Sequence, residues 1–231
     1  MKPYYEHAGI TIYHGDCREV LPTFAQDSID LIVTDPPYGV RWCSNFRQNS
    51  FAEIIGDESR EAGEIGLALS LRILRDRRHA YVFGRFNFTG LPITEPVELI
   101  WDKENWACGD LSAPWAKQHE YLQFLVKTES QAHRDYGAGR LAARLRKGSI
   151  LRGSAPSRNG DNHPTEKPIS ILRELIESSS RIGEKVLDPF MGSGTTAKAS
   201  ALESRRFIGI EIEEKYCEIA AKRLSQGVFQ F

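Results

Sequence analysis

The sequence predicts an α/β fold in which a seven-stranded, mostly parallel sheet is covered by helices on both faces. Short β-rich runs alternate with helical patterns along the chain, as in doubly wound sheets. Two of these runs end in turns rich in glycine or proline, where such sheets bind their ligands. The 231 residues suffice for one sizeable domain but hardly for two independent cores, so residues 1–231 are expected to form a single domain.

Strands and helices follow from two kinds of hydrophobic pattern. The predicted strands are Thr11–His14, Asp30–Thr34, His79–Gly84, Val97–Trp101, Tyr121–Lys127, Lys185–Leu187 and Arg206–Ile210. The predicted helices are Glu61–Asp76, Pro168–Ser180, Thr195–Ser204 and Glu213–Ser225. Pro168 suits the first turn of its helix, where its missing amide hydrogen costs nothing. The fourth and fifth strands lack an obvious crossover helix between them and are expected to pair antiparallel at one edge.

Composition excludes several classes of protein. Hydrophobic residues make up 41%, charged residues 26%, and the mean hydropathy is -0.40, as in soluble globular proteins. No stretch approaches the roughly 18 apolar residues of a membrane span, so we expect a cytoplasmic protein without a membrane partner. Cysteines are too far apart in sequence for a zinc site or a disulfide framework, and no bound metal is expected. They are Cys17, Cys43, Cys108 and Cys217.

The segment Asp188–Ala197 (DPFMGSGTTA) is the first candidate binding motif. It follows a predicted strand and opens a predicted helix, so its glycines let the backbone approach a ligand and the helix start offers free amides. Glu211 ends the next predicted strand, where it would hold ribose hydroxyls. The pattern fits a dinucleotide site as well as a nucleoside site, and a tight turn without a ligand is the simplest alternative.

The segment Asp35–Tyr38 (DPPY) is the second candidate motif and follows an apolar strand. Its acid and its aromatic residue suit an amino group on a flat base. Such an exocyclic amine carries two N–H groups and a lone pair delocalised into the ring. The Asp35 carboxylate and the Pro36 carbonyl can each accept one N–H and so direct the lone pair at a methyl donor. Tyr38 can stack on the base. A turn stiffened by proline would not by itself explain the flanking acid and aromatic residue.

With these motifs the chain resembles the amino-methylating DNA methyltransferases, in which DPPY is the catalytic tetrapeptide. Phe190–Gly194 matches the FxGxG cofactor loop of that family, and the order of the two motifs is similar to its circularly permuted beta group. His14–Cys17 resembles the segment that faces the cofactor adenine, and Asn162–Pro168 (NHPTEKP) resembles the motif before the FxGxG strand. His119–Tyr121 (HEY) resembles a segment near the target pocket, without an assigned role.

The resemblance implies a Rossmann-like fold that uses S-adenosylmethionine to methylate the N6 amine of adenine in double-stranded DNA, after the base leaves the duplex. The implied catalytic residues are Asp35, Pro36 and Tyr38. The implied cofactor-binding residues are Asp16, Thr165, Lys167, Asp188, Phe190, Gly192, Ser193, Gly194, Thr195 and Glu211. Among these, Thr165 and Lys167 are expected to meet the methionine carboxylate, Glu211 the ribose and Asp16 the adenine end.

The short target-recognition region is the main departure from the family. Only Glu129–Asp161 is available for it, a basic insert with seven basic residues against three acidic ones. Arg140, Arg144 and Arg146 are expected to contact DNA phosphates. Sequence reading would then be short, loose or shared with a second subunit in a homodimer. Gly39–Gly63 is expected to be a second substrate-binding loop.

A second basic cluster runs from Leu71 to Phe88, with five arginines against one aspartate. It is either another DNA-facing surface or a solvated helix face.

Other functions share some of these features. An N4-cytosine DNA methyltransferase, an RNA base methyltransferase and a protein glutamine methyltransferase use related tetrapeptides. A nicotinamide-dependent oxidoreductase would explain the glycine-rich turn but not Asp35–Tyr38, and the intact motifs argue against a DNA-binding module that has lost activity. Restriction-modification, orphan and phage-borne roles predict the same sequence features.

Overall fold

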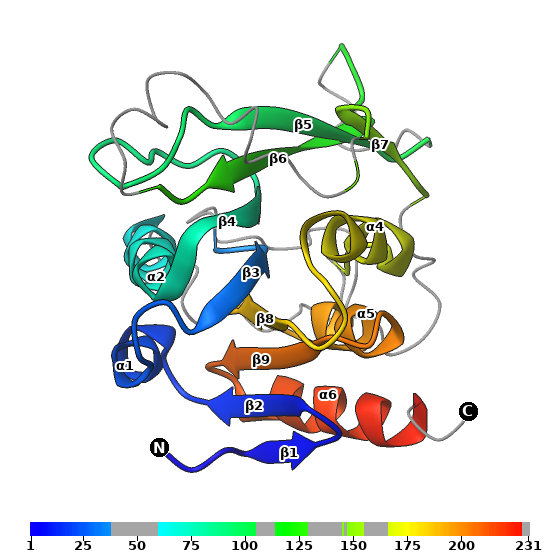
Figure 1. The fold of residues 1–231 in the computed structure, drawn as a ribbon. Helices are drawn as coiled ribbons and strands as arrows, with labels where there is room; N and C mark the ends of the chain where they lie inside the picture. The colour runs from blue at the N-terminus through cyan, green and yellow to red at the C-terminus, as the bar shows by residue number, and fades with distance from the viewer. Residues whose placement is uncertain (38–59, 105–113, 129–144, 146, 155–165, 228–231) are drawn as a thin grey trace.

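A nine-stranded sheet forms the centre of the structure, a computed structural model that describes residues 1–37, 60–104, 114–128, 145, 147–154 and 166–227. Its strand order is β1-β2-β9-β8-β3-β4-β6-β5-β7 (Figure 1). The strands are β1 (Tyr5–His7), β2 (Ile10–His14), β3 (Ile29–Thr34), β4 (Leu74–Phe83), β5 (Val97–Asp102), β6 (His119–Val126), β7 (Ile150–Arg152), β8 (Lys185–Asp188) and β9 (Arg206–Glu211). Among the strands within the described residues, β1–β2, β4–β6 and β5–β6 pair antiparallel and the other five pairs are parallel, which confirms a mostly parallel sheet.

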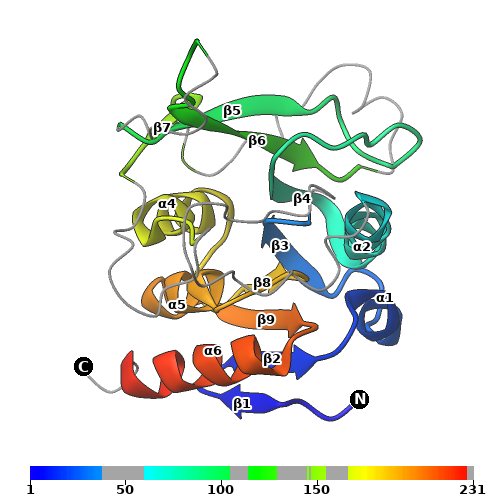
Figure 2. The same ribbon diagram turned by 180° about the vertical axis from the view of Figure 1, so that it is seen from behind.

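Helices cover both faces of the sheet, as predicted. One face carries α1 (Cys17–Val20), the short 3-10 helix η1 (Leu21–Thr23) and α2 (Arg60–Ile73). The other carries α4 (Ile169–Ser179), α5 (Thr195–Leu202) and α6 (Glu214–Gly227), and the two views agree on this division (Figures 1 and 2). No helix in the described part of the chain has both the length and the apolar composition that crossing a bilayer requires.

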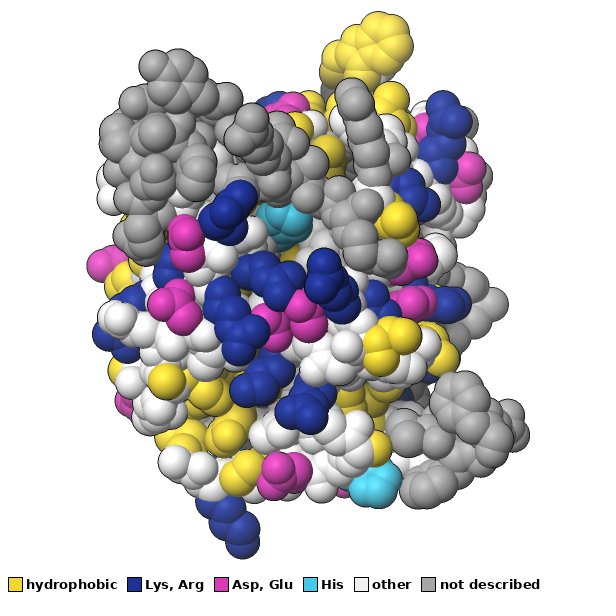
Figure 3. Space-filling view, viewed as in Figure 1, with side chains coloured by type: hydrophobic (Ala, Val, Ile, Leu, Met, Phe, Trp, Pro, Cys, Tyr) yellow, Lys and Arg dark blue, Asp and Glu magenta, His cyan; other side chains and the backbone are white. Residues whose placement is uncertain are grey.

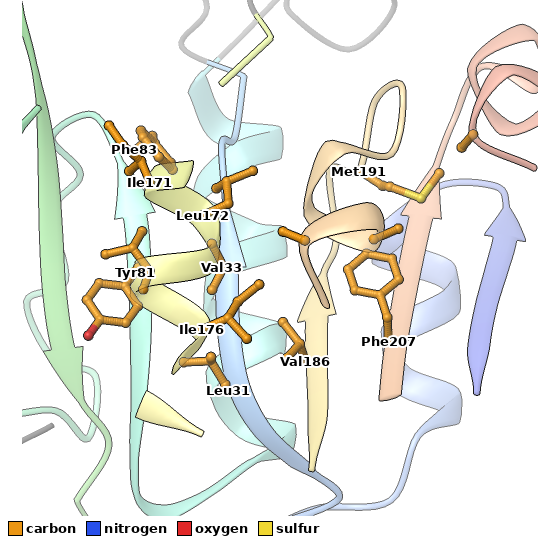
Figure 4. Packing of buried hydrophobic residues seen from close by; sticks show 14 of the residues in the cluster. Leu31, Val33, Tyr81, Phe83, Ile171, Leu172, Ile176, Val186, Met191 and Phe207 are labelled. Carbon is orange, nitrogen blue, oxygen red and sulfur yellow. The ribbon is translucent and has the colours of Figure 1, made fainter. Parts of the chain in front are cut away.

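Alternation along the strands divides the core between the two faces. Leu31 and Val33 of β3 pack with α4, while Ile32 between them packs with α2. Figure 4 shows three α4 side chains, Ile171, Leu172 and Ile176, beside Leu31, Val33 and Val186 of the sheet. Because β3 is buried on both sides, its central residues Leu31–Val33 are all apolar rather than alternating with polar ones.

All seven predicted strands are present, but the predicted count of seven is wrong. Each edge of the sheet carries one further strand, β1 at one side and β7 at the other. Both have three residues, which is too short for a periodic signal in the sequence. The antiparallel pairing of β5 with β6 is confirmed, although β7 rather than β5 forms the edge. Part of the basic insert predicted as a loop is therefore sheet.

The second basic cluster does not continue a helix, contrary to the predicted helix Glu61–Asp76. Helix α2 ends at Ile73 and β4 begins at Leu74, pairing with Ile29 before an irregularity where Arg77 takes a left-handed φ of 61°. Arg75 and Arg78 reach back to Asp30, at 2.5 and 3.4 Å. Residues Leu74–Asp76 were predicted as helix but belong to β4. The error arose because this charged run has no alternation of apolar residues.

Several charges of this cluster are neutralised within the protein. Arg78 also pairs with Glu184, and Arg85 binds Glu98 at 2.7 Å while its guanidinium lies 3.5 Å from the Tyr121 ring centroid. On the face shown in Figure 3, Lys and Arg side chains lie among Asp and Glu side chains. These pairs favour a structural role for the cluster over either of the two predicted roles.

Candidate active site

The candidate site lies where the sheet changes the direction of its strand order. The chain leaves β3 toward α2 on one face, whereas β8 is flanked by α4 and α5 on the other. Because β3 and β8 are parallel neighbours, a crevice is expected beyond their carboxyl ends. Asp35 follows β3 directly, and Asp188 is the last residue of β8. The two candidate motifs of the sequence therefore begin at adjacent strand ends.

The Asp35 carboxylate is partly exposed, with 26% of its side chain accessible, and its Oδ2 lies 2.7 Å from Nζ of Lys167. Pro36 is buried and Pro37 is half-buried, so the turn is anchored on the protein while the acid reaches its surface. Tyr38 lies outside the described residues. The described part of the tetrapeptide thus presents a carboxylate from a stiff backbone.

Two glycines of α2 let this helix approach both motifs. A Cβ at Gly63 would lie 2.9 Å from the Pro37 carbonyl oxygen, and one at Gly66 would lie 2.5 Å from the Phe190 ring. Side chains at these positions would displace the tetrapeptide turn or the aromatic ring. The predicted helix was correct in this region, but no role was predicted for these glycines. Their spacing of one helical turn was the available signal.

Asp188 stabilises the glycine-rich loop from within. Its buried Oδ1 accepts hydrogen bonds from the Thr34 hydroxyl at 2.8 Å and from the Phe190 amide at 3.1 Å. Burial raises the pKa of Asp188 to about 6, although these hydrogen bonds and one from Thr196 oppose the shift. Its carboxylate thus ties β8 to β3 and holds the first turn of the loop.

Two residues of the loop have left-handed backbone conformations, Gly192 with a φ of 55° and Gly194 with a φ of 85°. A Cβ at Gly192 would have no heavy atom within 4 Å, whereas one at Gly194 would lie 2.7 Å from Cβ of Ala220. Gly194 therefore allows α6 to pack against the loop, and Gly192 faces open space.

Glu211 ends β9 and is joined to the same loop. One carboxylate oxygen accepts a hydrogen bond from the Gly192 amide at 2.8 Å, and the other accepts one from the Glu213 amide at the same distance. Its side chain is buried, and burial raises the pKa of Glu211 to about 7 against the effect of both hydrogen bonds. A buried carboxylate beside a glycine loop is suited to accepting hydroxyl hydrogens from a ligand.

Ser193 and Thr195 bond to protein groups around this loop. The Thr195 hydroxyl donates to Glu166 at 2.9 Å, and Arg223 of α6 donates to the Ser193 hydroxyl at 3.1 Å and to both Glu166 oxygens. These bonds brace the loop against α6 and against the segment before α4. No role was predicted for Arg223, or for Glu166 although it lies in the NHPTEKP segment, because their contacts join parts of the chain that are distant in sequence.

Asp16 lies at the same end of the sheet, beyond β2, which pairs with β9 up to His14 and Glu211. It caps α1 by accepting the Arg18 amide hydrogen at 2.8 Å, and it also binds the Arg18 guanidinium. The Arg18 hydrogen bonds are the main reason why the pKa of Asp16 is lowered. Asp16, Glu211 and the glycine loop thus line successive strand ends.

Lys167, predicted to meet the methionine carboxylate, lies beside the Asp35 turn. Its ammonium group contacts Asp35 and, at 3.1 Å, Oε2 of Glu120, the second residue of β6. Glu120 belongs to the HEY segment to which the sequence assigned no role. Thr165, the other residue predicted to meet the methionine carboxylate, lies outside the described residues, as do Arg140, Arg144 and Arg146.

Comparisons with known proteins place the chain in a family. The N6_N4_Mtase family model, described as DNA methylase, matches residues 29–222. The Type II methyltransferase M2.LlaDCHI of Lactococcus lactis subsp. cremoris is 26% identical over 254 residues, covering 98% of this chain and 93% of that protein.

Solved structures confirm the Rossmann-like methyltransferase fold. The M1.HpyAVI–SAM complex has a TM-score of 0.68 at 24% identity, covering 93% of this chain and 98% of that one. The cytosine-N4-specific PvuII DNA methyltransferase has a TM-score of 0.72 at 19% identity, covering 96% of this chain and 88% of that one. The family model spans both the Asp35 turn and the glycine-rich loop. The chain therefore belongs to the N6/N4 DNA methylase family.

Proposed function

We propose that this protein transfers the methyl group of S-adenosylmethionine to the N6 amine of adenine in double-stranded DNA. One observation carries the proposal. Asp35 directly follows β3, and the glycine-rich loop begins at the end of β8, the parallel neighbour of β3. An acceptor for an amine thus lies beside a loop suited to a nucleoside. Membership of the DNA methylase family supplies the reaction class.

The residues present fit S-adenosylmethionine. Gly192 leaves open space beside the loop, Glu211 offers a buried carboxylate for ribose hydroxyls, and the half-buried Phe190 offers an aromatic face. Asp16 lies one strand beyond Glu211, where it would meet the adenine end. The other predicted cofactor residues of this loop would act mainly by shaping it, because each has a partner or a close contact inside the protein. These residues are Asp188, Ser193, Gly194 and Thr195.

When bound, S-adenosylmethionine supplies a methyl group that is electrophilic because its sulfur is a cation. The methyl carbon would pass to the base nitrogen and leave its bonding electron pair on sulfur, and the Asp35 carboxylate would take up the proton that the nitrogen releases. Asp35 and the Pro36 carbonyl would each accept one amine hydrogen and so align the lone pair for attack. Tyr38 would stack on the base once it has left the duplex.

Adenine is preferred to cytosine because an aspartate begins the tetrapeptide, as in the adenine branch that the sequence resembles. Cytosine N4 presents the same pair of N–H groups and is the alternative target. RNA and protein amides are alternative substrates of the same turn. A competition assay with labelled methyl donor, in which DNA, RNA and protein are offered together, tests the substrate class: label in DNA supports the proposal, and label confined to RNA or protein contradicts it.

For sequence reading, we retain residues 129–161 as the candidate target-recognition region. Ile150–Arg152 within it belong to the sheet, and Lys147 pairs with Glu174 of α4 at 3.5 Å. Most contacts that recognise the DNA sequence would therefore come from residues 129–146. Within this segment, Arg140, Arg144 and Arg146 would contact DNA phosphates. So short a segment favours a homodimer in which two copies share the reading.

Cofactor affinity is expected to fall about tenfold as the pH drops from 8 to 6, if Glu211 binds the ribose. The ionised carboxylate is the better acceptor for two hydroxyl hydrogens, and with a pKa of about 7 it is mostly ionised at pH 8 and mostly protonated at pH 6. Binding then requires loss of a proton at the lower pH, and affinity decreases. Calorimetric titration with S-adenosylhomocysteine at several pH values measures this.

The matched control is Glu211→Gln, which keeps the shape of the side chain but does not titrate. Its affinity should be weaker than that of the wild type at pH 8 and nearly independent of pH. Asp188 titrates about one unit lower and remains in both proteins, so a pH dependence that persists in Glu211→Gln would assign the effect to Asp188 and remove Glu211 from this role.

A further inference from the structure

Four charged side chains form a chain of contacts at the target side of the site. Nζ of Lys103 lies 2.6 Å from Oε1 of Glu120, and Oε2 of Glu120 lies 3.1 Å from Nζ of Lys167. The same ammonium group lies 2.7 Å from Oδ2 of Asp35. Two cations and two anions therefore alternate, beginning beyond β5 and ending at the catalytic turn after β3.

The position of the Lys167 ammonium differs from that expected of a cofactor ligand. It lies 5.0 Å from the ring centroid of Phe83, the last residue of β4. In the sheet, β4 and β6 lie on one side of β3, whereas β8 and the glycine-rich loop lie on the other. Lys167 therefore approaches Asp35 from the side on which a target base, rather than the cofactor, would enter.

The electrostatics of the cluster favour a fixed ion pair. Only 10% of the Lys167 side chain is exposed, and burial alone would lower its pKa. Asp35 and Glu120 outweigh that effect and raise the pKa of Lys167, so the ammonium remains charged. Burial likewise acts to raise the pKa of Glu120, but Lys167 and Lys103 lower it. A buried cation already flanked by two carboxylates has little capacity left for a third anion, such as the methionine carboxylate.

We propose that Lys167 and Glu120 are positioning residues for methyl transfer, with Glu120 holding Lys167 and Lys167 holding the Asp35 carboxylate in the orientation that receives the target amine. This inference rests on the proposed function, because it concerns the amine that Asp35 binds. It also gives the HEY segment a role and moves Lys167 from the cofactor to the target side.

The Lys167–Asp35 ion pair fixes the orientation of the Asp35 carboxylate and does not increase its basicity. A neighbouring cation weakens Asp35 as a base, but the nitrogen becomes strongly acidic only after it has gained the methyl group, so a weak acceptor suffices for the proton. Before transfer, the amine must be held so that its lone pair points at the methyl carbon. A displacement of about 1 Å in such a contact can cost about 10²-fold in rate.

The test separates turnover from cofactor binding in Lys167→Met and Glu120→Gln, with Lys222→Met as the matched control. Lys222 also pairs with a carboxylate, that of Glu218 at 2.6 Å, but it is exposed on α6. For Lys167→Met we expect kcat at saturating cofactor to fall about 10²-fold, with the Kd for S-adenosylhomocysteine within about threefold of the wild type. Glu120→Gln should lose about tenfold in kcat, and the control should lose nothing.

The double variant Lys167→Met/Glu120→Gln distinguishes a positioning role from a merely structural one. If Glu120 acts through Lys167, Glu120→Gln should reduce kcat less than twofold further in the Lys167→Met background. Should Lys167→Met fail to fold because two carboxylates are left together, Glu120→Gln alone decides, because it leaves the Lys167–Asp35 pair intact. Unchanged kcat in a folded Glu120→Gln protein then overturns the proposal.

Two further results would contradict the inference. A Kd for S-adenosylhomocysteine that rises more than tenfold in Lys167→Met, with kcat unchanged at saturation, would return Lys167 to the cofactor. Wild-type kcat in both variants would remove both residues from the mechanism while leaving DNA methylation intact. If the wild-type protein does not methylate DNA at all, the proposed function fails first and this inference fails with it.

Discussion

Replacing Asp35 with alanine should reduce methyl transfer by about 10³-fold or more while the Kd for S-adenosylhomocysteine stays within a few-fold of the wild type. The carboxylate reaches the surface of the site, where it pairs with Lys167 at 2.7 Å. Its charge also helps to raise the pKa of Asp188, but hydrogen bonds from Thr34 and Phe190 hold Asp188 in place, so the glycine-rich loop should keep its shape without Asp35. The loss of a single preorganised polar contact to a reacting group costs about 10²- to 10³-fold in other enzymes. Single-turnover kinetics with saturating DNA measure the effect.

Asp35→Asn and Glu218→Ala provide the controls for this prediction. The asparagine keeps one oxygen acceptor but loses the charge that pairs with Lys167, so partial activity above that of Asp35→Ala is expected. Glu218 is an exposed carboxylate on α6, and its removal should leave turnover unchanged. Retention of wild-type turnover by Asp35→Ala would remove Asp35 from the mechanism.

The two left-handed glycines of the loop should respond differently to alanine. Gly192→Ala is expected to weaken binding of S-adenosylhomocysteine by at least tenfold, because the new methyl group enters the open space where the cofactor would approach the backbone. Gly194→Ala should chiefly lower the free energy of unfolding, because its Cβ would meet Ala220 of α6 at 2.7 Å. Both variants also incur about 1–2 kcal/mol for an alanine in the left-handed region.

Because that backbone cost is shared, each variant serves as the control for the other. Thermal unfolding and calorimetric titration of both proteins separate the effects. If Gly192→Ala loses as much stability as Gly194→Ala but keeps normal cofactor affinity, the open space beside Gly192 is not part of the cofactor site. A Gly194→Ala protein as stable as the wild type would mean that α6 can move away from the loop without cost.

Periodic hydrophobic patterns were sufficient to predict most of the fold. The apolar run Leu31–Val33 in β3 and the helical spacing in α4 each reflect burial against neighbours, and both elements were located to within one residue at each end. The prediction of secondary structure failed where burial of apolar residues does not determine it. In the first part of β4, Arg75 and Arg78 are held by Asp30 across the sheet, an interaction that no local pattern encodes.

Local motifs were sufficient to nominate candidate site residues but not to predict their contacts. Asp35 and the glycine-rich loop were identified because a turn needs particular residues next to one another in sequence. The contact of Lys167 with Glu120 joins the segment before α4 to the start of β6, and only the folded sheet brings them together. The charge of Lys167 alone was compatible with either the cofactor or the target side. The hydrogen bonds that Asp188 accepts from Thr34 and Phe190 are further contacts that the local motif did not predict, and its binding of the cofactor stays a prediction.

The proposal that an adenine amine is the target is tested most directly by nucleoside analysis of methylated DNA. Unmethylated duplex DNA is incubated with the purified protein and S-adenosylmethionine, digested to nucleosides and separated by mass spectrometry, with Asp35→Ala as the blank. We expect N6-methyladenine to accumulate with the wild type and to be absent with the variant. N4-methylcytosine without N6-methyladenine would contradict the choice of base, and no methylated nucleoside from an intact, cofactor-binding protein would contradict the proposed function itself.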